Sequence, residues 1–266
     1  MTLRGLLWWL ALVPLAPVML PQALYAQRTT LRLPVAGGAR EGRVGLGQTG
    51  RPLRLRVLGE STVVGVGVER LEDGLAAQVA HCLSERFSRQ VHWRVAGESG
   101  IRLAELLRRL PEQAEEEPAD LALLVLGVND TLGLSGRRHW QQGLAQLIDA
   151  CAGENTRVLL AGVPPVGHFR ALPWPLRRMF GWRAALLDRW ARQVAERKGA
   201  LHLPVRLSFE PGFLARDGFH PSAAGYRRWA QDMLEQYLAS LDGPRASGSR
   251  PENERAGVMA GPEMRR

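Results

Sequence analysis

Short apolar runs alternate along the chain with longer segments whose apolar residues recur at helical spacing. The short runs predict strands at 53–58, 91–95, 121–126, 157–161 and 201–203. The longer segments predict helices at 71–87, 103–110, 139–150, 183–198 and 222–241. Strands that alternate with helices in this way predict a right-handed parallel sheet covered by helices on both faces.

The run from Leu121 to Leu126 is the most apolar part of the predicted domain and lies between Asp120 and Gly127. A strand that is apolar on both faces is typical of the centre of a parallel sheet. We therefore expect one α/β domain over residues 53–241, with helices above and below a sheet of about five strands.

The first 26 residues have the pattern of a targeting segment. Arg4 provides a basic start, the chain is apolar from Gly5 to Leu24, and residues 23–26 resemble a signal-peptidase site. Such a segment takes no part in the fold. Its apolar run is also about as long as a membrane span, so an uncleaved anchor is the alternative.

Four arginines follow this segment, at 28, 32, 40 and 43. Positive charge downstream of an apolar segment tends to stay in the cytoplasm, which opposes export. We expect an exported or membrane-anchored protein whose domain lies on the extracytoplasmic side, with attachment on the cytoplasmic side as the alternative.

Three further segments show no periodic apolar pattern. Residues 27–52 are rich in Gly and Arg and predict a linker, and residues 111–118 predict an exposed acidic connector. Residues 242–266 combine Gly, Pro, Ser and mixed charge with few apolar positions, which predicts a disordered tail.

The formal net charge is +9, and Lys198 is the only lysine beside the many arginines. These arginines are scattered rather than clustered, so we expect no nucleic-acid partner. Cys82 and Cys151 lie in separate predicted helices without a CxxC spacing, which favours two small buried apolar side chains over a disulfide. The spacing of cysteines and histidines predicts no metal site, and we expect no cofactor.

Ser61 lies in a glycine-rich turn directly after the first predicted strand, between Gly59 and Gly65. Ligands and catalytic groups of open parallel sheets collect at this edge, which makes Ser61 a candidate nucleophile. A serine in such a turn is more often a cap of the next helix, so the turn alone does not decide.

Other polar motifs also follow predicted strands. Gly100 comes after 91–95, Asn129 comes after 121–126, and Asp217 with His220 precedes the last helix. Each could be an ordinary turn or capping residue when taken singly. The carboxyl ends of parallel strands meet at one edge of a sheet, so we expect these motifs to converge.

In this order the motifs resemble those of the SGNH hydrolase superfamily, also called GDSL-type esterases and lipases. The resemblance covers the chain from Leu53 to about Leu241. It rests on four blocks: Gly59-Glu60-Ser61, Ser99-Gly100, Gly127-Val128-Asn129-Asp130 and Asp217-Gly218-Phe219-His220-Pro221. It implies a flavodoxin-like three-layer α/β/α sandwich.

The resemblance also implies roles for the site residues. Ser61 would be the nucleophile, His220 the base that takes its proton, and Asp217 the carboxylate that orients the imidazole. The oxyanion hole would consist of the backbone N–H groups of Ser61 and Gly100 and the side-chain amide of Asn129. The implied chemistry needs no metal or cofactor.

Glu60 departs from the pattern of the family, which usually has Asp before the serine. We expect its carboxylate to accept hydrogen bonds from backbone N–H groups and so to hold the turn. Its extra methylene could shift the turn, and a misplacement of about 1 Å at a catalytic group can cost about a hundredfold in rate. We still expect an active enzyme.

Residues 163–182 are rich in proline and aromatic residues and allow two interpretations. They form either a stiff surface excursion or an apolar wall that binds the acyl group beside His220. His168 within them is expected to be a loop residue rather than a second base.

We therefore predict a serine esterase that acts on small-molecule carboxylic esters through an acyl-serine intermediate, with small or medium acyl or lipid esters as substrates. The alternatives are a cell-envelope carbohydrate O-acetylesterase, suggested by the expected export, and a non-catalytic binding module, suggested by Glu60. Membrane association would occur through residues 1–26.

Overall fold

The computed structural model describes residues 3–109 and 119–242. The predicted acidic connector at 111–118 and the predicted tail beyond Asp242 lie outside the described residues. Within them, the helices and strands follow one another as α1 (Leu3–Thr29), β1 (Glu41–Val44), β2 (Leu53–Gly59), α2 (Leu75–Phe87), β3 (Val91–Gly97), α3 (Leu103–Arg109), β4 (Leu121–Val125), α4 (Val128–Leu132), α5 (Arg137–Cys151), β5 (Arg157–Ala161), α6 (Leu176–Lys198), β6 (Leu201–Leu203) and α7 (Ala223–Asp242).

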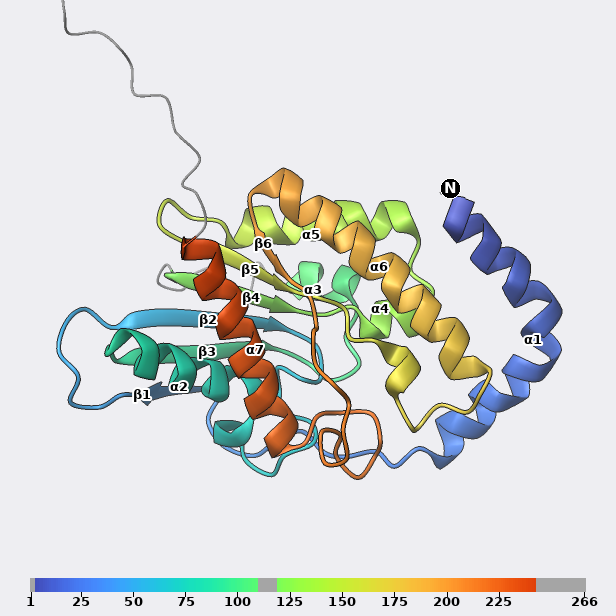
Figure 1. Ribbon diagram of the computed structural model, residues 1–266, viewed down its shortest axis with the longest axis horizontal. Coiled ribbons are helices and arrows are strands. Elements are labelled where there is room, and N and C mark those ends of the chain that lie inside the picture. Colours follow the sequence, from blue (N-terminus) through green and yellow to red (C-terminus); the bar gives the residue numbers. More distant parts are fainter. Residues whose placement is uncertain (1–2, 110–118, 243–266) are drawn as a thin grey trace, which may run out of the picture.

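The strands form one six-stranded sheet in the order β1-β3-β2-β4-β5-β6 (Figure 1). All neighbours pair in parallel except β1, which pairs antiparallel with β3. Without β1, the parallel strands have the flavodoxin-like order, in which the second strand in sequence lies at the edge beside the first. The predicted fold class is therefore confirmed.

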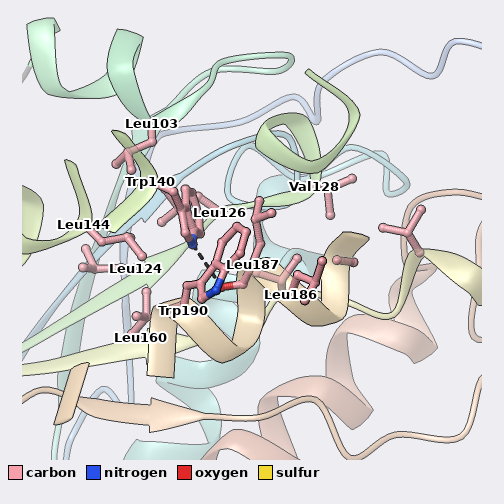
Figure 2. Close-up of a cluster of buried hydrophobic side chains, with 14 of the residues drawn as sticks. Leu103, Leu124, Leu126, Val128, Trp140, Leu144, Leu160, Leu186, Leu187 and Trp190 are labelled. Carbon is pink, nitrogen blue, oxygen red and sulfur yellow. Dashed lines mark hydrogen bonds between the residues drawn. The ribbon is translucent and has the colours of Figure 1, made fainter. Parts of the chain in front are cut away.

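Successive residues of the central strands face opposite sides of the sheet and feed two separate cores. Val57 pairs in register with Leu123, and these face the core that α2 and α7 complete. Leu58 pairs with Leu124, and these face the core under α3, α5 and α6. In this second core the indole of Trp140 donates a hydrogen bond of 3.0 Å to the carbonyl oxygen of Leu187 (Figure 2).

The predicted linker at 27–52 is wrong for Glu41–Val44, which form the edge strand β1. Glu41 lies opposite Arg94 in the sheet, and their side chains form an ion pair at 2.6 Å. Only Val44 of this strand is buried, so its four residues carry too weak a pattern to predict a strand. The domain therefore begins before Leu53.

The prediction that residues 1–26 take no part in the fold also differs from the structure. Residues 3–26 form most of α1, which packs against α6 (Figure 1). Trp8 is fully buried in this contact. By length and composition α1 could also cross a membrane, which is compatible with a signal sequence or an anchor.

Three helices differ from the expectations. Helix α2 begins at Leu75 rather than at Leu71, because residues 71–73 form a separate 3₁₀ helix that ends before Gly74. Helix α6 begins at Leu176 rather than at Arg183, directly after Pro175, and proline is favoured at helix starts. The sequence pattern does not predict the short helix α4, because its five residues include the polar pair Asn129 and Asp130, which is typical of a turn.

Candidate active site

Four segments meet at the carboxyl ends of β2, β3 and β4. The turn after β2 carries Ser61, the loop after β3 carries Gly100, helix α4 after β4 carries Asn129, and the loop before α7 carries Asp217 and His220. The convergence expected from the topology is therefore present in the structure.

Ser61 begins a tight turn that Gly59 makes possible. Gly59 has φ of +155°, and a Cβ at this position would overlap the carbonyl oxygen of Val125 in the neighbouring strand. The carbonyl oxygen of Ser61 accepts a hydrogen bond of 3.0 Å from the N–H of Val66, which closes the turn. The serine is buried, with 8% of its surface exposed.

His220 lies between Asp217 and Ser61. Its Nδ1 is 2.6 Å from Oδ2 of Asp217, and its Nε2 is 2.9 Å from Oγ of Ser61. A proton on Nδ1 held by the carboxylate leaves Nε2 free to accept the serine proton. These contacts form the Ser-His-Asp arrangement that activates a serine hydroxyl.

The Asp217 carboxylate is held by its own loop. Its Oδ1 accepts hydrogen bonds from the backbone N–H groups of Phe219 at 3.0 Å and His220 at 3.1 Å. Burial acts to raise the pKa of Asp217, but the hydrogen bonds from His220 and from these two N–H groups lower it below its ordinary value. The group therefore stays ionised beside the imidazole.

The expected oxyanion donors lie on three different loops. Gly100 is exposed and has φ of +85°, so its backbone conformation rather than a lack of space favours glycine. Asn129 Nδ2 donates to the carbonyl oxygen of Ile101 at 3.0 Å, which joins α4 to the loop of Gly100. An amide carries two N–H groups, and the second is the candidate oxyanion donor.

Glu60 joins the nucleophile turn to α4 rather than holding its own turn. Its two carboxylate oxygens accept the backbone N–H groups of Val128 at 2.9 Å and Asn129 at 3.0 Å. The expectation of hydrogen bonds to backbone N–H groups is confirmed. Burial raises the pKa of Glu60 to about 7 against the lowering effect of these hydrogen bonds, and the nearby Asp130 raises it further.

Asp130 is a second buried carboxylate that joins segments of the site, although its position in the sequence is typical of a turn residue. Its Oδ2 accepts the backbone N–H of Leu103 at 3.0 Å and its Oδ1 accepts the hydroxyl of Ser135 at 2.5 Å. Burial raises its pKa. In the sequence, only its position directly after Asn129 indicates that Asp130 could contribute to the site.

Tyr226 supports the site from α7. Its hydroxyl donates a hydrogen bond of 2.6 Å to the carbonyl oxygen of Val66, the residue whose N–H closes the Ser61 turn. The side chain of Tyr226 is fully buried. Burial raises the pKa of Tyr226, and the charge of Asp217 adds to this effect. Nothing in its local sequence distinguishes this tyrosine from an ordinary core residue.

A narrow apolar pocket opens beside Ser61 and His220. Of the predicted wall at 163–182, Pro164 and Phe169 line it. Most of the other apolar lining comes from Phe219, which belongs to the motif of His220, and from residues that the sequence pattern does not single out: Val205, Phe209, Phe213, Leu214 and Trp229. The ring of His168 stacks on Phe209 with centroids 5.2 Å apart, so it packs against the wall of the pocket.

Cys82 and Cys151 are free thiols, as predicted, although both are partly exposed. Burial raises the pKa of each thiol, which disfavours the reactive thiolate. Within residues 3–109 and 119–242, no cluster of three or more His, Cys, Asp or Glu side chains could hold a metal ion.

The sequence pattern of the GDSL-like lipase/acylhydrolase family matches residues 57–228. The chain belongs to this family. A curated relative, the GDSL-like esterase Rv1075c of Mycobacterium tuberculosis, is 25% identical over 198 residues, which cover 71% of this chain and 62% of the relative. This chain thus spans less than two thirds of that relative's length.

Solved structures share the fold at lower identity. TesA is 24% identical with a TM-score of 0.57, over 70% of this chain and 98% of TesA. The lipase/acylhydrolase of Enterococcus faecalis is 22% identical with a TM-score of 0.57, over 73% and 100% of the two chains. The esterase EstA of a Pseudoalteromonas species is 19% identical with a TM-score of 0.55, over 71% and 99%.

Proposed function

We propose that this protein hydrolyses carboxylic esters through an acyl-serine intermediate on Ser61. The observation that carries this proposal is the continuous contact from Asp217 through His220 to Ser61, at 2.6 and 2.9 Å. Membership of the GDSL-like lipase/acylhydrolase family supports it.

In the first half of the reaction, Ser61 Oγ attacks the ester carbonyl carbon while His220 Nε2 takes its proton. Asp217 stabilises the imidazolium that forms. The carbonyl oxygen becomes an oxyanion, which the N–H groups of Ser61 and Gly100 and the amide of Asn129 would stabilise. The intermediate expels the alkoxide, which leaves as the alcohol with the proton from His220.

In the second half, water attacks the acyl-serine carbonyl carbon while His220 takes a proton from it. The second tetrahedral intermediate expels Ser61 Oγ, which regains a proton from His220, and the carboxylic acid leaves. Every proton step uses the same imidazole, so neither half needs a second base.

The pocket beside Ser61 favours small or medium acyl or lipid esters as substrates. Its lining is almost entirely aliphatic and aromatic, and such pockets bind apolar groups. A series of p-nitrophenyl esters from acetate to decanoate tests this preference. We expect kcat/KM to rise from acetate to a medium chain, whereas activity confined to acetate would support a carbohydrate O-acetylesterase instead.

A fluorophosphonate probe tests the proposed nucleophile directly, because it reacts covalently with activated serines. We expect the wild-type protein to be labelled and Ser61→Ala to be unlabelled. Ser208→Ala is the matched control, since Ser208 is exposed in the segment that carries the pocket residue Phe209, and it should label like wild type. Equal labelling of Ser61→Ala and wild type would refute the catalytic proposal.

The catalytic domain would extend from β1 to α7. Its active site would lie on the extracytoplasmic side of a membrane, which is the location that the sequence predicts. Fractionation of labelled cells reports the compartment. Label found in soluble cytoplasm would contradict both export and membrane attachment.

A further inference from the structure

Helix α1 is attached to α6 by specific hydrogen bonds at two separated positions. The indole of Trp8 donates to the carbonyl oxygen of Met179 at 2.8 Å. The side chain of Gln22 donates to the carbonyl oxygen of Trp174 at 2.8 Å and accepts the N–H of Leu176 at 3.3 Å. These contacts satisfy backbone groups around the start of α6, so α1 completes this helix.

Trp8 also covers a buried cation. The guanidinium of Arg183 lies 5.0 Å from the ring of Trp8 and 5.6 Å from that of Trp190, and only 2% of Arg183 is exposed. Such a cation–π contact is strongest where the cation is desolvated. Removal of residues 1–26 would uncover Arg183 and the apolar side of α6, which argues that the segment stays on the protein.

The opposite side of α1 is equally apolar and is not covered by the described residues. Its exposed side chains recur at helical spacing and include Leu3, Leu7, Leu10, Val13, Leu20 and Leu24, which are between 46% and 73% exposed. A helix that is apolar on all sides belongs in an apolar environment. An exposed apolar surface of this kind marks an interaction site.

The charges around α1 favour a bilayer over a second copy of the chain. Arg4 precedes most of the helix, Arg28 and Arg32 lie at its other end, and no acidic residue precedes Glu41. If two α1 helices packed together, the arginines at their ends would lie close to each other and repel. Anionic lipid headgroups would instead neutralise both ends. The bulky side chains of the exposed stripe also differ from the small residues that let helices pack closely in membranes.

We propose that α1 is retained in the working protein and lies in the plane of an anionic bilayer, with one stripe on α6 and the opposite stripe among the acyl chains. Figure 1 shows α1 at the edge of the molecule, beside the N-terminal end of α6. A spanning α1 would draw α6 into the bilayer, and α6 carries Arg177, Arg178 and Arg189.

Two segments connect the contact between α1 and α6 with the active site: the segment that precedes α6 and the segment that follows α1. Trp174, which is 68% exposed, belongs to the segment in which the N–H of Ala171 donates to the carbonyl oxygen of Gly218, beside Asp217. After α1, the N–H of Ala36 donates to the carbonyl oxygen of Val64 in the Ser61 turn. The arrangement suits esters dissolved in the bilayer, and this choice of substrate rests on the proposed function.

Flotation of the full chain with vesicles of phosphatidylcholine and phosphatidylglycerol tests the docking. We expect Val13→Glu to lower the bound fraction about tenfold, because a carboxylate in the acyl region is costly. Leu46→Glu is the matched control: Leu46 is 76% exposed and Val13 is 70% exposed. Leu46 lies just after β1, which is on the opposite side of the molecule from α1 (Figure 1). It should bind like wild type.

Hydrolysis of p-nitrophenyl butyrate without lipid separates the two proposals, and we expect it to be unchanged in both variants. Binding without any hydrolysis would refute the proposed function and leave the docking intact. Hydrolysis without vesicle binding, or equal binding of Val13→Glu and wild type, would overturn the docking. The docking proposal would also be overturned if the wild-type protein formed a dimer that did not bind vesicles and Val13→Glu were monomeric. That result would show that a second copy of the chain covers the stripe.

Two measurements test the retained, in-plane helix. The mass of the membrane-bound protein should include residues 1–26, and a chain that begins at Gln27 would overturn the proposal. Arg4→Cys and Gln27→Cys, which replace exposed polar residues at the two ends of α1 outside the apolar stripe, should each react, with Cys82 and Cys151 replaced by serine, with a membrane-impermeant maleimide added outside vesicles. Protection of one end alone would show a spanning helix and overturn it.

Discussion

The two buried carboxylates of the site, Asp217 and Glu60, have similar hydrogen bonds and opposite pKa shifts. Each accepts two backbone N–H groups within 3.1 Å. Asp217 also faces the imidazole of His220, and its pKa is lowered despite burial. Glu60 faces Asp130 instead, and burial raises its pKa to about 7.

The hydrogen bond from the imidazole of His220 is the largest of the effects that lower the pKa of Asp217, and Glu60 has no imidazole partner to offset its burial. The two carboxylates also differ in the groups that they contact. In the proposed mechanism Asp217 would act on the charge that develops on His220, whereas Glu60 joins the Ser61 turn to α4 through hydrogen bonds to the N–H groups of Val128 and Asn129. Substitutions of the two groups should therefore differ in kind.

Asp217→Asn should have the largest effect on activity. The amide can hold the imidazole in the wrong tautomer and cannot stabilise the imidazolium, so we expect kcat to fall by about ten-thousandfold. Steady-state hydrolysis of a p-nitrophenyl ester measures it, with circular dichroism to confirm folding. A loss below about tenfold in a folded variant would remove Asp217 from the relay.

Asn129→Ala should lower kcat by about a hundredfold to a thousandfold, the effect of losing one oxyanion donor. Asn155→Ala is the control, because Asn155 is exposed in the turn before β5. The expected signature is a fall in kcat with little change in KM. A change in KM alone would show that Asn129 binds substrate without stabilising the oxyanion.

Glu60→Gln should change the pH dependence of stability. A carboxyl whose pKa rises from its ordinary value of 4.5 to about 7 on folding stabilises the protein below pH 4 relative to high pH, and this advantage disappears as pH rises through 7. The full difference is about 3 kcal/mol.

Urea unfolding at pH 5 and pH 8 measures this difference. Wild type should lose more stability than Glu60→Gln between the two values, because the glutamine does not titrate. The comparison with Glu60→Gln cancels the contributions of the other groups. Parallel losses in the two proteins would show that Glu60 is ionised throughout this range.

Tyr226→Phe should have the smallest effect. It leaves the carbonyl oxygen of Val66 without its hydroxyl partner, which costs about 1–3 kcal/mol when the acceptor is buried. Thermal unfolding measures it against Tyr25→Phe, whose hydroxyl lies on a side chain that is 65% exposed. Equal melting temperatures of both variants would show that the hydrogen bond contributes nothing to stability.

The elements around the site could be predicted because their signals are local. The apolar run at 121–126 and the helical spacing at 71–87 each reflect burial of one short segment. The strand Arg157–Ala161 has the predicted bounds, and helix α7 begins and ends one residue after the predicted ones. The edge strand β1 lacks such a signal, because its hydrogen bonds to β3 rather than its own side chains hold it.

The sequence by itself determined the fold class and the identity and order of Ser61, Gly100, Asn129, Asp217 and His220, since these depend on local pattern and on motif order. Only the tertiary structure decided what Glu60 holds, which phenylalanines line the pocket, and that α1 lies on α6. Each of these depends on contacts between residues distant in sequence, such as the 68 positions between Glu60 and Val128. Such contacts leave no periodic pattern, because the chain path between them sets which side chains meet.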